Sequence, residues 1–533
     1  MKTILRPFVC AALLASLAFA PAVRAVDLAP EQRLADFDQL TNLLRNSYSM
    51  IELKKQTMGL DFEVVSKAYR EKIAQVPNDN QFYDLLSAFI GEFKDAHLNH
   101  VRPSSMSARL GFTLRRIEGK AIITSVDAKV LPPESFPFKA GDELVSIDGK
   151  PVMQLVRERR PFISSAREDS AQGKLVRQLA VRSGSVGPVP TGMTRLAIKP
   201  MGGEVQNVEL PWLVTGRPLP GLSFHTDNGP FKGIRGLRPG ERNPDACIDP
   251  MDVNDAQAAA PDENAPMPMW GPQDGMVVNS TLFPAALFDS PKGPLGYIRI
   301  PTFSPDDTDA ATVEFRRVLA QMKLARGLVL DLADNPGGSV TYGLTVASMF
   351  TNKMLELPKK AERANRSTLA EYRQYEQSKN DRVKAMAQYH EEAIEKAMEA
   401  GLGLTDPIAM LYRPSQAPDQ EVRFTKPLLV LINDQSYSCA DLVPSVLQDN
   451  KLCKTFGVTT AGAGGSVGQY GPLSYSGSTL SVTINVTQRV NGKYIENLGV
   501  DADIPYEPTQ KDVATKWSGY RKAYIDALSG MLQ

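Results

Sequence analysis

A serine at the junction of a strand and a helix is the feature of this sequence best suited to chemistry. The apolar run 427–432 predicts a buried strand, and a helix is expected over 439–449. Ser438 lies between them, where a hydroxyl is held exposed and the first helical N–H groups face any developing negative charge. This arrangement suits a nucleophile. Two alternatives stay open: Ser438 only caps the helix, or Cys439 is the nucleophile, although a side chain just inside the helix should turn away.

A second element could stabilise negative charge. The strand expected over 327–332 ends in Asp334-Asn335-Pro336-Gly337-Gly338. Paired glycines at the carboxyl end of a strand let backbone N–H groups approach a ligand closely. We therefore consider Gly337, Gly338 and the N–H of Cys439 as an oxyanion hole, with an ordinary strand-to-helix turn as the alternative.

A hydroxyl nucleophile needs a base and a group that orients that base. His97, at the end of a predicted helix that starts near residue 80, is the candidate for accepting the Ser438 proton. Glu496, flanked by apolar strand residues, is the candidate for orienting the imidazole. A surface histidine and a surface glutamate are the alternatives.

Metal or cofactor chemistry has little support in the sequence. His97 and His100 are the nearest approach to a ligand pair, and neither a cysteine pattern nor an H-E-x-x-H motif accompanies them. We expect no metal and no cofactor.

Composition limits the class of protein. The chain has 533 residues, 42% hydrophobic and 23% charged, which predicts a globular protein of about three domains. Its 60 Lys and Arg residues balance 60 Asp and Glu residues, for a formal net charge of +0. Because no overall field attracts polyanions, nucleic acid is not an expected partner.

The N-terminus has the pattern of an export signal. Residues 1–25 combine Lys2 and Arg6 with an apolar run and small residues before Ala25. That run is too short to span a bilayer, and no later stretch is long enough. We expect a signal peptide over 1–25 and an exported protein, periplasmic or secreted, without stable membrane insertion. The three cysteines that then remain do not form a disulfide framework.

Three further segments precede the strand-helix region. Residues 26–104 show helical periodicity and carry His97, and residues 105–215 change to short strands and turns. There, Leu110-Gly111-Phe112 resembles the carboxylate-binding loop of PDZ domains, and Gly141-Asp142-Glu143 begins a stretch that resembles their signature. A β module that binds nothing is the alternative. Residues 216–290 are rich in Pro, Gly, Asp and Asn and predict a long loop, either an inhibitory or an activation segment.

The remainder alternates strands and helices. Residues 291–533 therefore predict an α/β domain, with a charged helical insertion at about 359–420. His390 lies in this insertion and is expected on a solvated helix face.

Several separated motifs together resemble the S41 serine peptidases, a family that includes the C-terminal processing peptidases and the tricorn core. They occur in the family's order and cover most of the mature chain: Phe93-Lys94-Asp95-Ala96-His97, Gly337-Gly338, Ser436-Tyr437-Ser438-Cys439-Ala440-Asp441, Gln448-Asp449 and Ile495-Glu496-Asn497-Leu498-Gly499-Val500. The resemblance implies an α/β catalytic core of S41 type, with the N-terminal helical region and the PDZ-like module attached. It also implies an endopeptidase that acts on polypeptides through an acyl-enzyme.

One departure from the family bears on the mechanism. Processing peptidases activate their serine with a lysine in a G-K-G turn, and the matching turn here is Gly462-Ala463-Gly464. Resemblance to the tricorn and chlamydial branch implies that His97 is the base and Glu496 the acid, in a homodimer made as a self-cleaved zymogen. A Ser/Lys dyad with Lys451 or Lys454 stays open.

Two other classes of protein remain. A PDZ-like peptide-binding protein on a peptidase scaffold that has lost catalysis would explain the missing lysine. An esterase or amidase is disfavoured because no G-x-S-x-G motif occurs.

Overall fold

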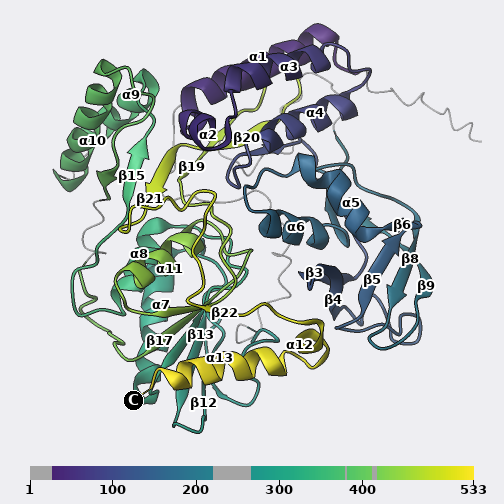
Figure 1. Cartoon of the computed structure of the whole chain (residues 1–533), viewed down its shortest axis with the longest axis vertical. Coiled ribbons are helices and arrows are strands. Elements are labelled where there is room, and N and C mark those ends of the chain that lie inside the picture. The colour runs from purple at the N-terminus through teal and green to yellow at the C-terminus, as the bar shows by residue number, and fades with distance from the viewer. Residues whose placement is uncertain (1–26, 220–265, 378–380, 411–416, 533) are drawn as a thin grey trace, which may run out of the picture.

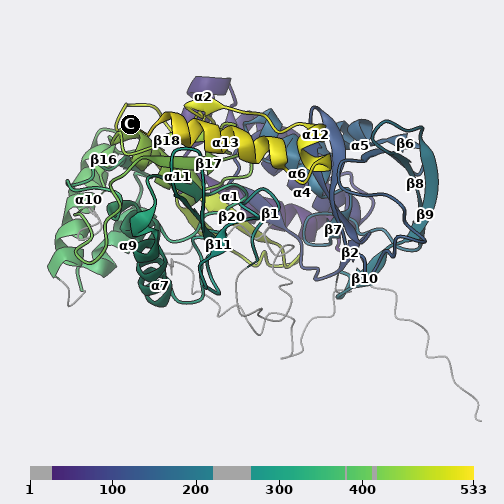
Figure 2. The same ribbon diagram turned by 90° about the horizontal axis from the view of Figure 1, so that it is seen from below.

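The computed structural model describes residues 27–219, 266–377, 381–410 and 417–532. The predicted signal peptide and most of the predicted loop lie outside these residues. The described chain has an N-terminal group of helices, a β module and an α/β domain, as predicted (Figure 1). The β module lies on the opposite side of the molecule from the helical insertion in both views (Figures 1 and 2).

Four helices form the N-terminal region: α1 (Pro30–Ser47), α2 (Ile51–Met58), α3 (Phe62–Ile73) and α4 (Asp79–Glu92). Their apolar faces share a buried core that includes Phe37, Leu40 and Phe89. Strand β1 (Asn99–Val101) then pairs antiparallel with β20 (Thr479–Thr483). Strand β20 pairs antiparallel on its other edge with β19 (Val467–Tyr470). This pairing places the segment that follows α4 beside a strand from the C-terminal part of the chain.

The β module is built on the sheet β3-β4-β5-β8-β9 with β6 beside β5. Its strands are β3 (Phe112–Ile117), β4 (Lys120–Val126), β5 (Glu143–Ile147), β6 (Lys150–Pro151), β8 (Met193–Lys199) and β9 (Gln206–Pro211). Helices α5 (Val152–Arg159) and α6 (Glu168–Arg177) share its core. A small sheet of β2 (Ser107–Arg109), β7 (Val181–Ser183) and β10 (Leu213–Thr215) completes the module. Strand β3 is an edge strand.

The α/β domain has a seven-stranded sheet of order β11-β12-β13-β14-β17-β18-β22. These strands are β11 (Met276–Val277), β12 (Ala285–Phe288), β13 (Leu295–Arg299), β14 (Leu328–Asp331), β17 (Leu428–Ile432), β18 (Lys454–Gly457) and β22 (Ile504–Pro505). From β13 onward all neighbours are parallel, so the carboxyl ends of β14 and β17 lie side by side.

Helices cover both faces of this sheet, which explains its uninterrupted apolar strands. Leu328 and Leu330 face a core shared with α7 (Thr308–Gln321), α8 (Val340–Ser348) and α11 (Cys439–Asp449). Val329 faces the opposite core, which contains α13 (Ser518–Gly530), the yellow helix of Figures 1 and 2. Helix α12 (Gln510–Ala514) precedes α13.

Two predictions about loops need correction. The segment 216–290 was expected to be a loop throughout, but its last part forms β11 and β12. The α/β domain therefore begins before residue 291, because a short apolar pattern among Pro and Gly residues pairs with β13. The insertion begins with β15 (Lys359–Glu362) rather than a helix, and this strand pairs with β21 (Asn485–Gln488) and β16 (Ile408–Ala409).

Helices α9 (Arg366–Tyr375) and α10 (Asp381–Glu399) form the predicted helical hairpin. His390 is buried in it rather than solvated, so that expectation was wrong: its ring stacks on Tyr372 with 4.5 Å between centroids. Among the described residues, no helix is long and apolar enough to span a bilayer.

Candidate active site

Ser438 lies at the junction of β17 and α11 with a backbone that few residues adopt. Its φ is 56° and its ψ is −115°, a strained conformation for a residue with a Cβ. Although Ser438 is the N-cap residue, its side chain makes no capping hydrogen bond, so the capping alternative fails. Instead, Asp441 and Leu442 donate their N–H groups to the carbonyl of Ser438. The turn is therefore held by backbone bonds, and the hydroxyl is not needed to start the helix.

Cys439 turns into the domain, as expected for a residue just inside the helix. Its Sγ lies 3.4 Å from the carbonyl oxygen of Ser339, and the side chain is 1% exposed within the core between α8 and α11. The thiol is therefore badly placed to attack a substrate.

The paired glycines lie directly against Ser438. A Cβ built on Gly337, whose φ is 98°, would be 2.5 Å from the Cβ of Ser438 and 2.9 Å from the backbone nitrogen of Cys439. Only glycine allows this approach. The N–H of Gly337 donates to Oδ1 of Asn335 at 2.8 Å. Gly338 is therefore the member of the pair whose N–H we assign to an oxyanion hole with Cys439.

His97 is buried in the turn between α4 and β1, at 4% exposure. The carboxylate of Asp95 accepts its backbone N–H at 3.0 Å, and Thr483 donates to the other oxygen of that carboxylate at 2.6 Å. Ser481 donates to the carbonyl of His97 at 2.8 Å. Strand β20 thus fixes both sides of the histidine backbone, so the alternative of a surface histidine is wrong.

Glu496 is also buried, at 3% exposure, so the alternative of a surface glutamate is wrong. Its Oε1 accepts the N–H of Thr487 at 2.6 Å. Its Oε2 has no hydrogen-bond partner within the described residues. Burial raises the pKa of Glu496 to about 8, and the carboxylates of Asp95 and Asp441 add to this rise while the Thr487 N–H opposes it.

A small buried cluster joins the segments that carry these residues. Ala96, next to His97, contacts Tyr437, next to Ser438, together with Ala461 and Ala463. The turn that lacks the lysine is thus part of the same site. Cβ atoms built on Gly464 and Gly465 would lie 3.4 Å and 3.2 Å from Oε1 of Glu496.

The sequence analysis missed the residue that holds this turn. Asp441 accepts the N–H groups of Gly462 and Ala463 at 2.9 Å and 3.0 Å, and the hydroxyl of Thr460. Burial raises its pKa to about 6, against the effect of these bonds. An acidic residue three positions after Ser438, in the first turn of a buried helix, is the signal that could have identified it.

The alternative lysines are excluded by their position. Lys451 and Lys454 follow the C-terminal end of α11, and eleven helical residues place that end about 16 Å from Ser438. Lys454 is paired instead with Asp503 at 3.7 Å.

The histidine pair does not form a metal site. Both ring nitrogens of His100 bond hydroxyls at 2.9 Å, those of Ser87 and Ser478, and burial lowers its pKa to about 3. No group of three or more potential ligands able to hold a metal is present in the part of the chain that the structure describes.

An ionic clamp precedes the paired glycines. Asp334, with φ 59°, forms ion pairs with Arg115 of β3 and Arg177 of α6. It also exchanges hydrogen bonds with Asn433, which follows β17: the Asn433 amide donates at 2.8 Å and accepts the Asp334 N–H at 3.0 Å. Burial would raise the pKa of Asp334, but the arginines Arg115, Arg177 and Arg299 hold it well below its ordinary value. The β module therefore supports the loops on both sides of Ser438.

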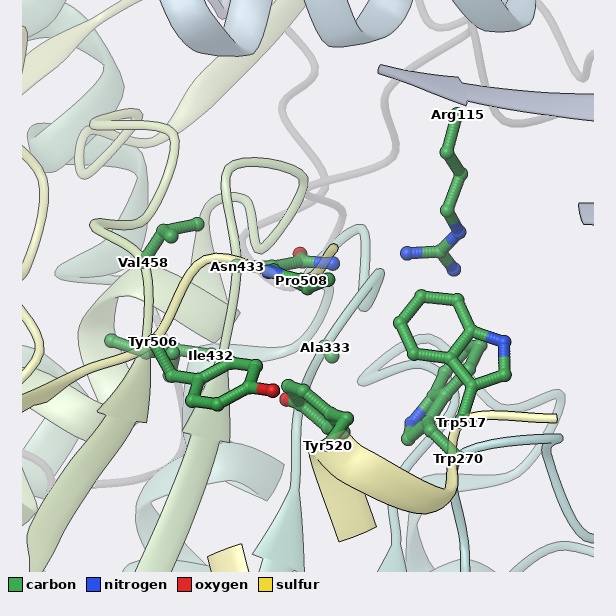
Figure 3. Close-up of a pocket in the computed structure, with 11 residues that line it drawn as sticks. Arg115, Trp270, Ala333, Ile432, Asn433, Val458, Tyr506, Pro508, Trp517 and Tyr520 are labelled. Atoms are coloured by element: carbon green, nitrogen blue, oxygen red, sulfur yellow. The ribbon is translucent and has the colours of Figure 1, made fainter. Parts of the chain in front are cut away.

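A small pocket adjoins this clamp. Arg115 reaches from β3 toward Trp270 and Trp517, with its guanidinium 4.7 Å from the Trp270 ring centroid (Figure 3). Asn433, Tyr506 and Tyr520 also line it, so residues of the β module and of the α/β domain both contribute. The pocket therefore belongs to the interface between the module and the α/β domain.

We expect Asp334→Ala to lower the free energy of unfolding by about 3 kcal/mol, because it leaves two partly buried arginines without their anion. Urea unfolding followed by tryptophan fluorescence measures this. Glu209→Ala, which removes the exposed Arg195–Glu209 pair at 3.0 Å, is the control and should change stability little. An equal effect of both changes would contradict the clamp.

The predicted carboxylate-binding loop is buried. Leu110, Gly111 and Phe112 precede or begin β3, and the Leu110 N–H donates to the carbonyl of Ala180 at 3.0 Å. Strand β3 and helix α6 border the position where a PDZ domain receives a peptide as an added strand. Arg116 and Gln172 bridge these two elements at 2.9 Å.

Helix α6 also contacts the loop that carries Ser438. Ser170 and the hydroxyl of Tyr437 are 2.8 Å apart, and the Ser170 carbonyl accepts the Gln435 amide at 3.1 Å. The Lys174 ammonium lies 4.9 Å from the Tyr437 ring centroid. Ser438 is therefore one residue away from a contact with the β module.

A buried serine at a strand-to-helix junction, paired glycines against it and an attached β module define a serine-type peptidase with a PDZ domain. Residues 294–506 match the family model of peptidase family S41, and residues 106–218 match that of the PDZ domain. The domain over residues 294–506 is therefore similar to peptidase family S41, as the motifs of the sequence predicted.

The relatives of this chain match it over different shares of its length. A protein of Chlamydia trachomatis is 26% identical over 96% of this chain and 94% of its own. A carboxy-terminal-processing protease of Bartonella bacilliformis is 27% identical over 47% of this chain and 46% of its own. The crystal structure of mature CPAF is 24% identical, with a TM-score of 0.76 over 94% of this chain and 98% of that one, which shows that the fold is shared.

Proposed function

We propose that this protein is an exported endopeptidase in which Ser438 is the nucleophile, His97 the general base and Glu496 the acid that orients His97. The observation that carries this proposal is the strained Ser438 turn, whose side chain caps nothing and which lies directly against Gly337. Strain of this kind persists where the surrounding structure enforces it, and such residues cluster at active sites.

The reaction follows from these positions. Ser438 Oγ attacks the carbonyl carbon of the peptide bond while His97 accepts the hydroxyl proton. The N–H groups of Gly338 and Cys439 stabilise the oxyanion of the tetrahedral intermediate. His97 then protonates the leaving amine, and water, deprotonated by the same imidazole, hydrolyses the acyl-enzyme. Glu496 stabilises the imidazolium formed in both steps.

A fluorophosphonate probe tests the nucleophile directly. Labelling of the purified protein, followed by peptide mass spectrometry, should place one adduct on Ser438. Absence of labelling together with binding of C-terminal peptides would favour the second candidate, a peptide-binding protein without catalysis. The observation that favours this second candidate is the turn Gly462-Ala463-Gly464, which lacks the lysine of the processing peptidases.

We expect kcat/KM to rise with pH between about 6 and 9. Because the pKa of Glu496 is raised to about 8, its carboxyl is protonated below that pH and cannot stabilise an imidazolium; it ionises, and activity appears, as the pH increases. Initial rates on a quenched-fluorescence peptide measure the profile. In Glu496→Gln this rise of kcat/KM with pH (the acid limb of the profile) should disappear. Activity should be about 10⁴-fold lower, as it is after the equivalent change in the triad of trypsin. An unchanged limb in that variant would assign the titration to another group.

The proposal extends to maturation and assembly. Removal of residues 1–25 and self-cleavage in the segment between β10 and β11 are supported by the signal-like N-terminus, the composition of that segment and likeness to a protein described as mature. Formation of a homodimer is what the resemblance of the sequence to the tricorn and chlamydial branch implies. Mass spectrometry and light scattering of wild type and Ser438→Ala test these steps. An active, intact monomer would contradict the zymogen and the dimer.

A further inference from the structure

A buried lysine in the N-terminal helices connects the two segments that carry His97 and Glu496. Lys54 of α2 is 0% exposed. Its Nζ donates to the carbonyl of Lys94 and to Oδ1 of Asn497, both at 2.8 Å. Lys94 is three residues before His97, and Asn497 directly follows Glu496. One ammonium group thus links both segments.

The backbone at both ends of this link needs support. Lys94 has φ 48° and Asn497 has φ 68°, so both residues adopt the left-handed conformation. The Asn497 N–H donates to the carbonyl of Gly462 at 2.9 Å. Lys54 therefore holds two strained turns that flank catalytic residues, from a helix that supplies neither of those residues.

Charge gives Lys54 a second role. The negative charges of Asp95 and Glu496 stabilise the charged form of its ammonium group, and the positive charge of Lys94 destabilises it. Burial lowers the pKa of Lys54 to about 8, against the pull of the two carboxylates. The Tyr48 hydroxyl faces the same carboxylates, and its burial raises its pKa well above the ordinary value, so Tyr48 supplies no charge. Asp441 adds a further carboxyl near Glu496.

We propose that Lys54 is a positioning residue for peptide hydrolysis, which fixes the turns that carry His97 and Glu496 and favours the carboxylate form of Glu496 over its protonated form. This inference rests on the proposed function of His97 and Glu496. A buried carboxylate is stable only when it is paired or hydrogen-bonded, and Lys54 provides the positive charge in a cluster of three carboxyl groups.

The experiment measures kcat and KM of the full mature chain from pH 5.5 to 9.5 for Lys54→Met and Lys54→Arg. Lys55→Met is the matched control, because Lys55 is the next residue and its side chain is 65% exposed. Lys54→Met should lower kcat about 10-fold or more at pH 7 with KM nearly unchanged, since removal of the cation moves the ionisation of Glu496 to higher pH by about one unit. The loss should shrink above pH 9, where Glu496 ionises in both proteins and Lys54 of the wild type is itself neutral.

Two further results separate positioning from folding. Lys54→Arg keeps the charge and should keep the acid limb of the wild type even if its rate is lower. Lys54→Met should cause a smaller loss in a Glu496→Gln background than in the wild type, because only its support of the His97 turn then remains to be lost. A uniform loss at every pH, an acid limb displaced equally by Arg and Met, or full additivity with Glu496→Gln would each overturn the proposal. If Ser438→Ala cleaves as well as wild type, the proposed function fails instead, and that result is independent of Lys54.

Discussion

Ser438→Ala is expected to reduce peptide cleavage by about 10⁴-fold to 10⁶-fold, because it removes the atom that forms the acyl-enzyme. The fold should persist, since the Ser438 side chain makes no cap bond and its carbonyl, which starts α11, remains. Cleavage of an unfolded protein and of a quenched peptide measures the loss. His97→Ala should give a similar loss, and the double variant should lose little more, because the two residues act as a unit.

Cys439→Ala is the control that separates the adjacent nucleophile. The Cys439 thiol is buried against Ser339, so its removal should cost some stability through a small cavity but leave most of the activity. The assignment of Ser438 as the nucleophile would be wrong if the Cys439→Ala variant were inactive and the Ser438→Ala variant active.

Gly338→Ala is expected to lower kcat by about 100-fold to 1000-fold through displacement of one oxyanion donor. A Cβ on Gly338 would lie 2.1 Å from the backbone carbonyl carbon of Phe303, and the residue has φ 137°. The loop must move, and the N–H moves with it. KM should change little, because the oxyanion exists only along the reaction path. Single-turnover kinetics separates the two parameters.

Gly119→Ala provides the matched control for backbone strain. Gly119 also has a positive φ, 74°, but a Cβ there meets nothing within 4 Å. We expect a loss of about 1 kcal/mol in stability without loss of activity. Equal kinetic defects in both variants would show that the Gly338 effect arises from general destabilisation.

The sequence allowed the main elements to be predicted because their periodicity is strong. The apolar strands β14 and β17 and the helix α11 appear where expected. The predicted loop was wrong over β11 and β12 because such short strands carry little pattern of their own: β12 depends on pairing with β13, and the edge strand β11 depends on pairing with β12. His390 was misjudged because helical charge patterns do not show that Tyr372 covers the ring.

For the candidate site, the sequence by itself determined which groups are chemically able to react: a serine after an apolar strand, two adjacent glycines, a histidine and a glutamate. It also showed that the family's lysine is absent. This information is local, because the type of a residue and the strand-to-helix pattern around it depend only on neighbouring positions in the sequence.

Only the tertiary structure decided the environment of these groups. Burial raises the pKa of Glu496 to about 8, and Asp95 and Asp441, which lie far from it in sequence, add to this rise. Lys54 looks like an exposed helical lysine in the sequence, yet it is buried between the His97 and Glu496 turns. Burial and charge pairing depend on contacts between distant segments, so pKa values and positioning residues become visible only when the chain is folded.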